Sequence, residues 1–99
     1  MTLEYRKLSE AEIADALPSV SGWEVEGGKL VKEFGFENYL DGVAFASAVG
    51  FAAEQLDHHP DLSIGWRKVR VAMSTHAVEG ISPYDFELAR RIEALFGKS

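Results

Sequence analysis

The chain contains an apolar–polar alternation that is followed by two glycines and a second, apolar-rich segment. The segments Trp23–Glu26 and Lys29–Phe36 flank Gly27-Gly28. Alternation with a period of two is typical of half-buried strands, and a glycine pair supplies the positive φ angles of a two-residue hairpin turn. This stretch therefore predicts an antiparallel β-hairpin.

A second alternation follows in the region 62–73. Its apolar residues change parity midway, which would move them to the opposite face of a strand that ran straight through. A turn at Arg67-Lys68 removes the conflict, so a second hairpin is expected. The alternating residues are Leu62, Ile64 and Trp66 in one strand and Val69, Val71 and Met73 in the other.

Capping residues indicate where two helices begin. Ser9 with Glu12 forms the pattern of a capping box, and Pro18 ends the short helix that follows. Ser82 with Asp85 repeats the pattern, with proline at the first helical position. The apolar spacing of the last helix predicts that it buries Phe86, Ala89, Ile92, Ala94 or Leu95, and Phe96.

The longest helix is expected from about residue 38 to 57, with Asn38 as its cap. Its middle, VAFASAVGFAA, contains one hydroxyl and no charge. A helix that packs by one face shows polar residues on the other, so this one should be covered on both sides. We expect a homodimer or homotetramer with this helix in the interface; the alternative is a central helix inside a monomer.

The elements follow one another in the order α-β-β-α-β-β-α. Two antiparallel hairpins can join into a four-stranded sheet, and three helices can cover its apolar face. The sequence thus predicts an α+β two-layer sandwich with all three helices on one face. The 99 residues suit a single domain spanning 1–99, because two independent cores would be too small.

Composition narrows the function. The net charge of -6 argues against nucleic-acid binding and against binding to anionic membranes. The absence of cysteine excludes disulfides, thiol nucleophiles and thiolate metal sites. No stretch resembles a signal peptide or approaches the ~20 apolar residues of a membrane-spanning helix. A cytoplasmic protein is expected.

The candidate chemistry lies in the segment EQLDHHPD. It contains Glu54, His58 and His59, and the remaining histidine, His76, follows Ser74-Thr75 after the last strand. On one helix, Glu54 and His58 would be four apart and could meet. Imidazoles titrate near neutral pH, so three of them around one concavity suit general acid–base catalysis.

Other interpretations of the same residues stay open. The adjacent histidines could interact with the dipole of a helix C-terminus, and His76 could be a polar residue of an exposed loop. A three-histidine metal site lacks the usual spacing of two ligands. Asp85 is sufficiently explained by its capping box, and core packing is the expected role of Trp23 and Trp66.

These residues together resemble the signature of the pterin-4a-carbinolamine dehydratase family. The resemblance covers about residues 8–96 and includes the aromatic entry to the long helix, residues 34–39. Adjacent histidines followed by proline, with a third histidine at this distance, make a specific signal. The signature residues are Glu54, His58, His59, Pro60, Trp66, His76 and Asp85, with Trp23 matching upstream.

The resemblance implies dehydration of 4a-hydroxytetrahydrobiopterin to quinonoid dihydropterin, as part of tetrahydropterin recycling. It implies His58 and His76 as alternative general acids, with His59 holding the pterin or acting as base. Glu54 and Asp57 would orient the imidazoles, and the backbone of residues 74–77 would bind the ring. The implied binding residues are Asp57, His58, His59, Ser74, Thr75, His76 and Ala77; the supporting ones are Trp23, Pro60 and Asp85.

The resemblance also implies that neither metal nor organic cofactor is used, and that members form dimers or tetramers. Some relatives with this fold act as dimerisation cofactors of a transcription factor. A non-catalytic protein-binding module is therefore the alternative function. Three retained histidines favour the enzyme, since a scaffold needs none of them.

Overall fold

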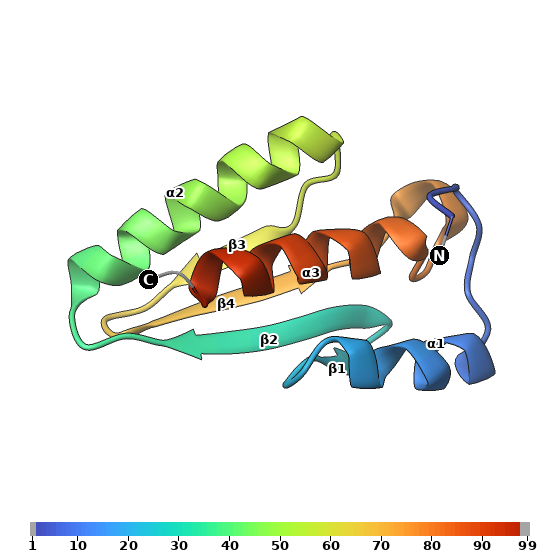
Figure 1. Ribbon diagram of the computed structural model, residues 1–99, viewed down its shortest axis with the longest axis horizontal. Coiled ribbons are helices and arrows are strands. Elements are labelled where there is room, and N and C mark those ends of the chain that lie inside the picture. Colours follow the sequence, from blue (N-terminus) through green and yellow to red (C-terminus); the bar gives the residue numbers. More distant parts are fainter. Residues whose placement is uncertain (1, 98–99) are drawn as a thin grey trace.

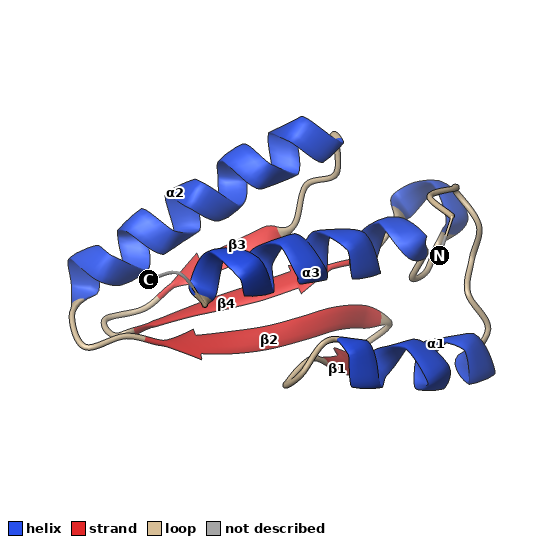
Figure 2. Ribbon diagram, in the orientation of Figure 1, coloured by secondary structure: helices blue, strands red, loops and turns tan. Residues whose placement is uncertain are grey.

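A computed structural model describes residues 2–97. It has the predicted order of helices and strands, with two short 3₁₀ turns added (Figure 2). The elements are α1 (Glu10–Ala16), η1 (Leu17–Ser19), β1 (Glu24–Glu26), β2 (Lys29–Gly35), α2 (Tyr39–Leu56), β3 (Asp61–Ile64), β4 (Lys68–Met73), η2 (His76–Val78) and α3 (Pro83–Phe96).

The four strands form one antiparallel sheet in the order β1-β2-β4-β3. Each predicted hairpin is present, and β2 pairs with β4 to join them. Gly27 and Gly28 have φ angles of 57° and 77°, as the first hairpin turn requires. Figure 1 shows α2 and α3 beside each other over the sheet, with α1 beside the first hairpin.

The core lies between the helices and one face of the sheet. Leu30 and Phe34 of β2 share this face with Val69, Val71 and Met73 of β4, by strand alternation. All three helices contribute to the same cluster, through Ala16 of α1, Phe45, Ala46, Val49 and Ala53 of α2, and Phe86, Leu88, Ala89 and Ile92 of α3. The predicted α+β two-layer fold is confirmed.

The helix caps agree with the sequence. Capping boxes are present at Ser9 and Ser82, and the Asn38 side chain accepts a hydrogen bond from the Asp41 N–H. Trp23 is 4% exposed, as predicted, and its indole donates to Glu93 over 3.0 Å.

The second hairpin turn lies earlier than predicted. The strand β3 ends at Ile64 and β4 begins at Lys68, and the Gly65 N–H donates to the Lys68 carbonyl over 2.8 Å. Trp66 therefore belongs to the turn and is 75% exposed. The prediction that it packs in the core is wrong, because the alternation of β3 stops before it.

One side of α2 is covered and the other is open. Phe45, Val49 and Ala53 pack into the core, whereas Leu40 and Phe51 are each 73% exposed. Within residues 2–97, no helix combines the length and apolar character needed to cross a membrane.

Candidate active site

The histidine pair lies just beyond α2 and not on it. The helix ends at Leu56, and Asp57 takes a left-handed conformation with φ of 51°. The expected contact between Glu54 and His58 required both residues to lie on one helix. Because His58 lies beyond the end of α2, these two side chains do not form that contact. Glu54 instead faces His59, whose Nε2 lies 3.5 Å from its carboxylate, and both side chains are exposed.

His58 enters the protein interior and meets Asp85 at the start of α3. The ring nitrogen Nε2 lies 2.6 Å from Asp85 Oδ1, and His58 is 7% exposed while Asp85 is fully buried. Asp85 Oδ2 accepts from the Thr75 hydroxyl over 2.8 Å and from the Ser82 N–H over 2.9 Å. The Ser82 and Thr75 hydroxyls are 2.7 Å apart.

This buried network ties together three elements. Because the Thr75 hydroxyl donates to Asp85, the hydroxyl of Ser82 is left to donate to Thr75. The two oxygens of Asp85 thus accept hydrogen bonds from three donors inside the protein, as buried polar groups generally require. Asp85 is at the centre of this network and connects the loop after α2, the segment after β4 and the first turn of α3.

The two adjacent histidines differ in exposure, because His58 is buried and His59 is exposed. In the sheet, Asp61 lies opposite Ala72 and Leu30 opposite Met73. Asp61 and Ala72 lie on the face away from the helices, because the neighbouring Val71 and Met73 face the core. An ion pair of 3.1 Å between Lys29 and Asp61 spans the same end of the sheet.

His76 lies in a polar hollow at this end. We call it the His76 hollow; its volume is about 380 Å³. It is formed by the first hairpin turn and by the loop that follows β4. The lining residues are Gly27, Gly28, Lys29, Ser74, Thr75, His76, Glu79 and Gly80.

The structure thus brings some predicted residues together and leaves others apart. His58 and His76 are connected through Thr75, which binds Asp85 by its side chain and precedes His76 in the chain. Among the described residues, the lining of the His76 hollow does not include His58, His59 or Glu54. Asp57, His59 and Ala77 are exposed. The ligand contacts proposed for all of the predicted site residues stay predictions.

Several residues at this site were missed from the sequence. The resemblance named Asp85 as a supporting residue, but its pairing with His58 was not predicted, since a residue 27 positions away gives no local signal of the pair. The Tyr84 ring lies 5.8 Å from that of His58, and Tyr5 stacks on Tyr84 at 4.5 Å. Lys29 belongs to the first hairpin and Glu79 to the loop after β4. Both line the hollow because these two segments lie together in the folded protein.

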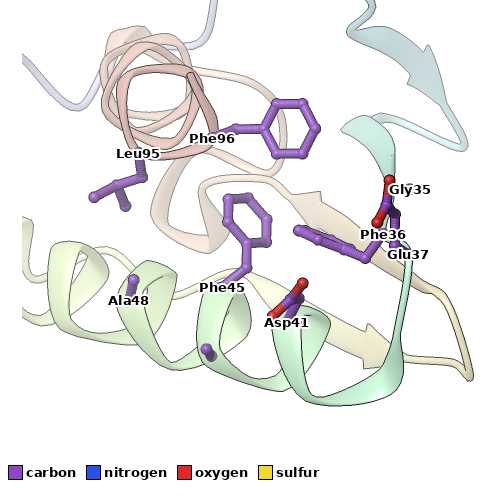
Figure 3. A pocket seen from close by; sticks show the side chains of 9 residues that line it. Gly35, Phe36, Glu37, Asp41, Phe45, Ala48, Leu95 and Phe96 are labelled. Atoms are coloured by element: carbon purple, nitrogen blue, oxygen red, sulfur yellow. The ribbon is translucent and has the colours of Figure 1, made fainter. Parts of the chain in front are cut away.

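A second, larger cavity lies at the other end of α2 and α3. It has a volume of about 640 Å³, and Phe36, Phe45 and Phe96 point into it (Figure 3). Asp41 and Glu37 are at its margin. None of the predicted site residues is among the described residues that line it. Within residues 2–97, no three His, Cys, Asp or Glu side chains are grouped as a metal site would require.

Sequence relatives agree on one family. The family profile described as "Pterin 4 alpha carbinolamine dehydratase" matches residues 6–95. A protein of Natronomonas pharaonis is 45% identical over 89 residues, covering 90% of this chain and 95% of the relative. One of Chloroflexus aurantiacus is 40% identical over 91 residues, covering 92% and 98%. Both are named "Putative pterin-4-alpha-carbinolamine dehydratase".

Solved structures share the fold. A Brucella melitensis protein described as a transcriptional coactivator/pterin dehydratase superposes with a TM-score of 0.86 at 30% identity, covering 91% of this chain and 98% of that one. A pterin dehydratase-like protein described as a RuBisCO assembly factor superposes with a TM-score of 0.63 at 24% identity, covering 78% and 89%, and shows the fold alone. By sequence and by structure, the chain belongs to the pterin 4 alpha carbinolamine dehydratase family.

Proposed function

We propose that this protein dehydrates 4a-hydroxytetrahydropterin to quinonoid dihydropterin by histidine acid–base catalysis, in the cytoplasm. The observation that carries the proposal is the juxtaposition of a buried His58–Asp85 pair and a His76-lined hollow, joined by Thr75, in a chain of this family. The reaction needs an acid at the C4a hydroxyl and a base at N5, because hydroxide is a poor leaving group.

The His58–Asp85 pair supports one of these proton-transfer roles. Asp85 holds Nε2 of His58, so the ring is oriented and its Nδ1 is left for proton exchange. His58 is 7% exposed, so little of its surface is open to a substrate.

His76 and His59 supply the more accessible imidazoles. His76 is exposed at the hollow, and the exposed ring of His59 lies near Glu54. A flat bicyclic ring held between the hollow and the α2–β3 loop would meet imidazoles from different sides. We assign His76 and His58 as alternative acids, with His59 holding the pterin or accepting the N5 proton.

The decisive experiment compares His76→Ala and His59→Ala with the unmodified protein. Both side chains are exposed, so folding should be unaffected. We expect His76→Ala to lower the dehydration rate by roughly 10²-fold or more, as loss of a general acid does. Stopped-flow absorbance on freshly generated 4a-hydroxytetrahydrobiopterin measures the rate.

Two controls make this test specific. Glu33→Ala changes an exposed residue of β2 and should leave the rate unchanged. Combining His76→Ala with His58→Ala should abolish dehydration of both C4a epimers. If the double variant is folded by circular dichroism and dehydrates the substrate at the original rate, the assignment of these histidines is wrong.

A second candidate function is a non-catalytic binding module. It is supported by the Brucella melitensis structure, whose description includes transcriptional coactivator. Thermal denaturation with 7,8-dihydrobiopterin at millimolar concentration separates the two functions. The enzyme should be stabilised by its ligand, whereas the absence of any shift would favour the module.

We further propose that the protein is a homodimer or homotetramer with α2 in the interface. Leu40 and Phe51 support this, because two large apolar side chains are each 73% exposed on a helix whose other side is already packed. Between them the helix presents small residues, including Ala44 and Ser47, which allow another helix to approach closely.

A further inference from the structure

Glu79, one of the residues that line the His76 hollow, has a strained backbone. Its φ of 52° lies in the left-handed region, which disfavours any residue with a Cβ. Among the described residues, Asp57 is the other non-glycine residue with positive φ, and it precedes His58. Both strained positions thus flank the candidate site, which is where such strain is commonly retained.

The loop around Glu79 is closed tightly. The Thr75 N–H donates to the Gly80 carbonyl over 2.7 Å, and the Glu79 N–H donates to the His76 carbonyl over 3.1 Å. These bonds hold residue 79 in the left-handed conformation whatever its side chain. Glycine would adopt it without strain, so the backbone alone gives no reason for a glutamate here.

The carboxylate of Glu79 is not used inside the protein. Within residues 2–97, no hydrogen bond or ion pair engages it, and Glu79 is among the residues that line the hollow together with His76. Asp85 provides the contrast, because both of its oxygens are occupied. Glu79 therefore offers two free acceptor oxygens to a molecule in the hollow.

The proposed substrate has a matching group. The pyrimidine ring of a pterin carries a 2-amino group beside the N3–H, and these are two parallel donors. A carboxylate accepts such a pair with two parallel hydrogen bonds, which are strengthened by its charge. The hollow, at about 380 Å³, is within the range of small-molecule sites.

We propose that Glu79 is a specificity-determining residue that binds the 2-amino-pyrimidine edge of the pterin. This inference rests on the proposed function, and it names the group through which the substrate is recognised. Glu79 binds and orients the ring while the histidines carry the proton transfers. Its removal therefore weakens binding and leaves the chemical step of the bound substrate unchanged.

The test measures the preference for the 2-amino group directly. Dissociation constants are determined by calorimetry for 7,8-dihydropterin and for 7,8-dihydrolumazine, in which oxygen replaces the amino group. We expect the unmodified protein to prefer dihydropterin by about ten- to a hundred-fold, as for a hydrogen bond to a charged group. Glu79→Gln should reduce the preference to about three-fold or less, raise KM and retain kcat.

Glu79→Gly adds an independent readout. Relief of the left-handed strain should raise Tm by about 4 °C or more, while the preference for dihydropterin is lost. A purely structural role predicts a change in Tm without a change in preference. Glu33→Gln, on the exposed side of β2, is the matched control and should alter neither quantity.

The outcomes separate this inference from the function on which it rests. If the unmodified protein prefers dihydropterin and Glu79→Gln keeps that preference, the role of Glu79 is overturned and the dehydratase proposal stands. If the unmodified protein binds neither compound at millimolar concentration, both proposals are overturned.

Discussion

At the scale of single residues, Asp85 has two roles. It completes the capping box of α3 through the Ser82 N–H, and it holds His58 through the opposite oxygen. The first role follows from sequence spacing, and the second requires the loop after α2 to lie against α3. One buried carboxylate therefore links helix initiation to the geometry of the candidate site.

Replacing this carboxylate should be costly. Both oxygens of Asp85 accept hydrogen bonds, from donors on His58, Thr75 and Ser82. Asp85→Asn replaces one oxygen with an NH₂ group, which is itself a donor and therefore faces another donor. We expect the free energy of unfolding to fall by about 2–4 kcal/mol, the range for unpaired buried polar groups and broken buried ion pairs. Urea denaturation measures the change.

The matched control is Asp61→Asn, which alters an exposed carboxylate paired with Lys29. Exposed ion pairs contribute about 0–1 kcal/mol, so its effect should be small. Equal stabilities of Asp85→Asn and the unmodified protein would show that the buried network does not need its charge.

At the scale of elements, the start of α1 combines a capping box with an ion pair. The Ser9 N–H donates to Glu12 over 3.0 Å, and Arg6 lies 2.8 Å from the same carboxylate. The Ser9 N–H, followed by Arg6, lowers the pKa of Glu12 below its ordinary value. A lowered pKa in the folded state means that the charged carboxylate stabilises the fold.

This predicts a loss of stability in acid. The contribution of Glu12 is fully present above the pKa of an unfolded glutamate, about 4.3, and is lost as pH falls through the lower folded pKa. Glu12→Gln should therefore lower Tm at pH 7, and its effect should diminish as pH falls below the pKa of an unfolded glutamate. Thermal denaturation followed by circular dichroism, at several pH values, measures the difference.

Glu10→Gln, also in the first turn of α1, is the matched control. A constant Tm difference between Glu12→Gln and the unmodified protein at every pH would contradict the assigned role of the charge.

Elements were predicted well where local signals decide them. The two capping boxes, the Gly27-Gly28 turn and the Asn38 cap depend on residues within a few positions of one another. The second hairpin was less accurate. Alternation suggested that the strand reached Trp66, but pairing with β4 stops at Ile64. Only the partner strand determines where a ladder of hydrogen bonds ends.

At the scale of the whole molecule, the open side of α2 predicts self-association. Leu40→Lys combined with Phe51→Lys places charge at two positions of high exposure. If α2 forms the interface between copies, the double variant should dissociate into monomers, since unpaired charges in a buried interface are unfavourable. Light scattering coupled to size exclusion measures the molar mass.

Ala14→Lys, on the exposed side of α1, is the matched control and should keep the assembly of the unmodified protein. The same molar mass for the double variant would place the interface elsewhere. A monomeric unmodified protein would refute the proposed oligomer.

The sequence by itself determined the order of elements, the fold class and the residue types available for proton transfer. These depend on periodicity, capping and turn residues, which act over short distances along the chain. The tertiary structure alone decided that His58 faces Asp85, that Glu54 lies by His59, and that Glu79 shares a hollow with His76. Such contacts join residues from different elements, and no local preference specifies them. Packing of the whole core sets the distances between those elements.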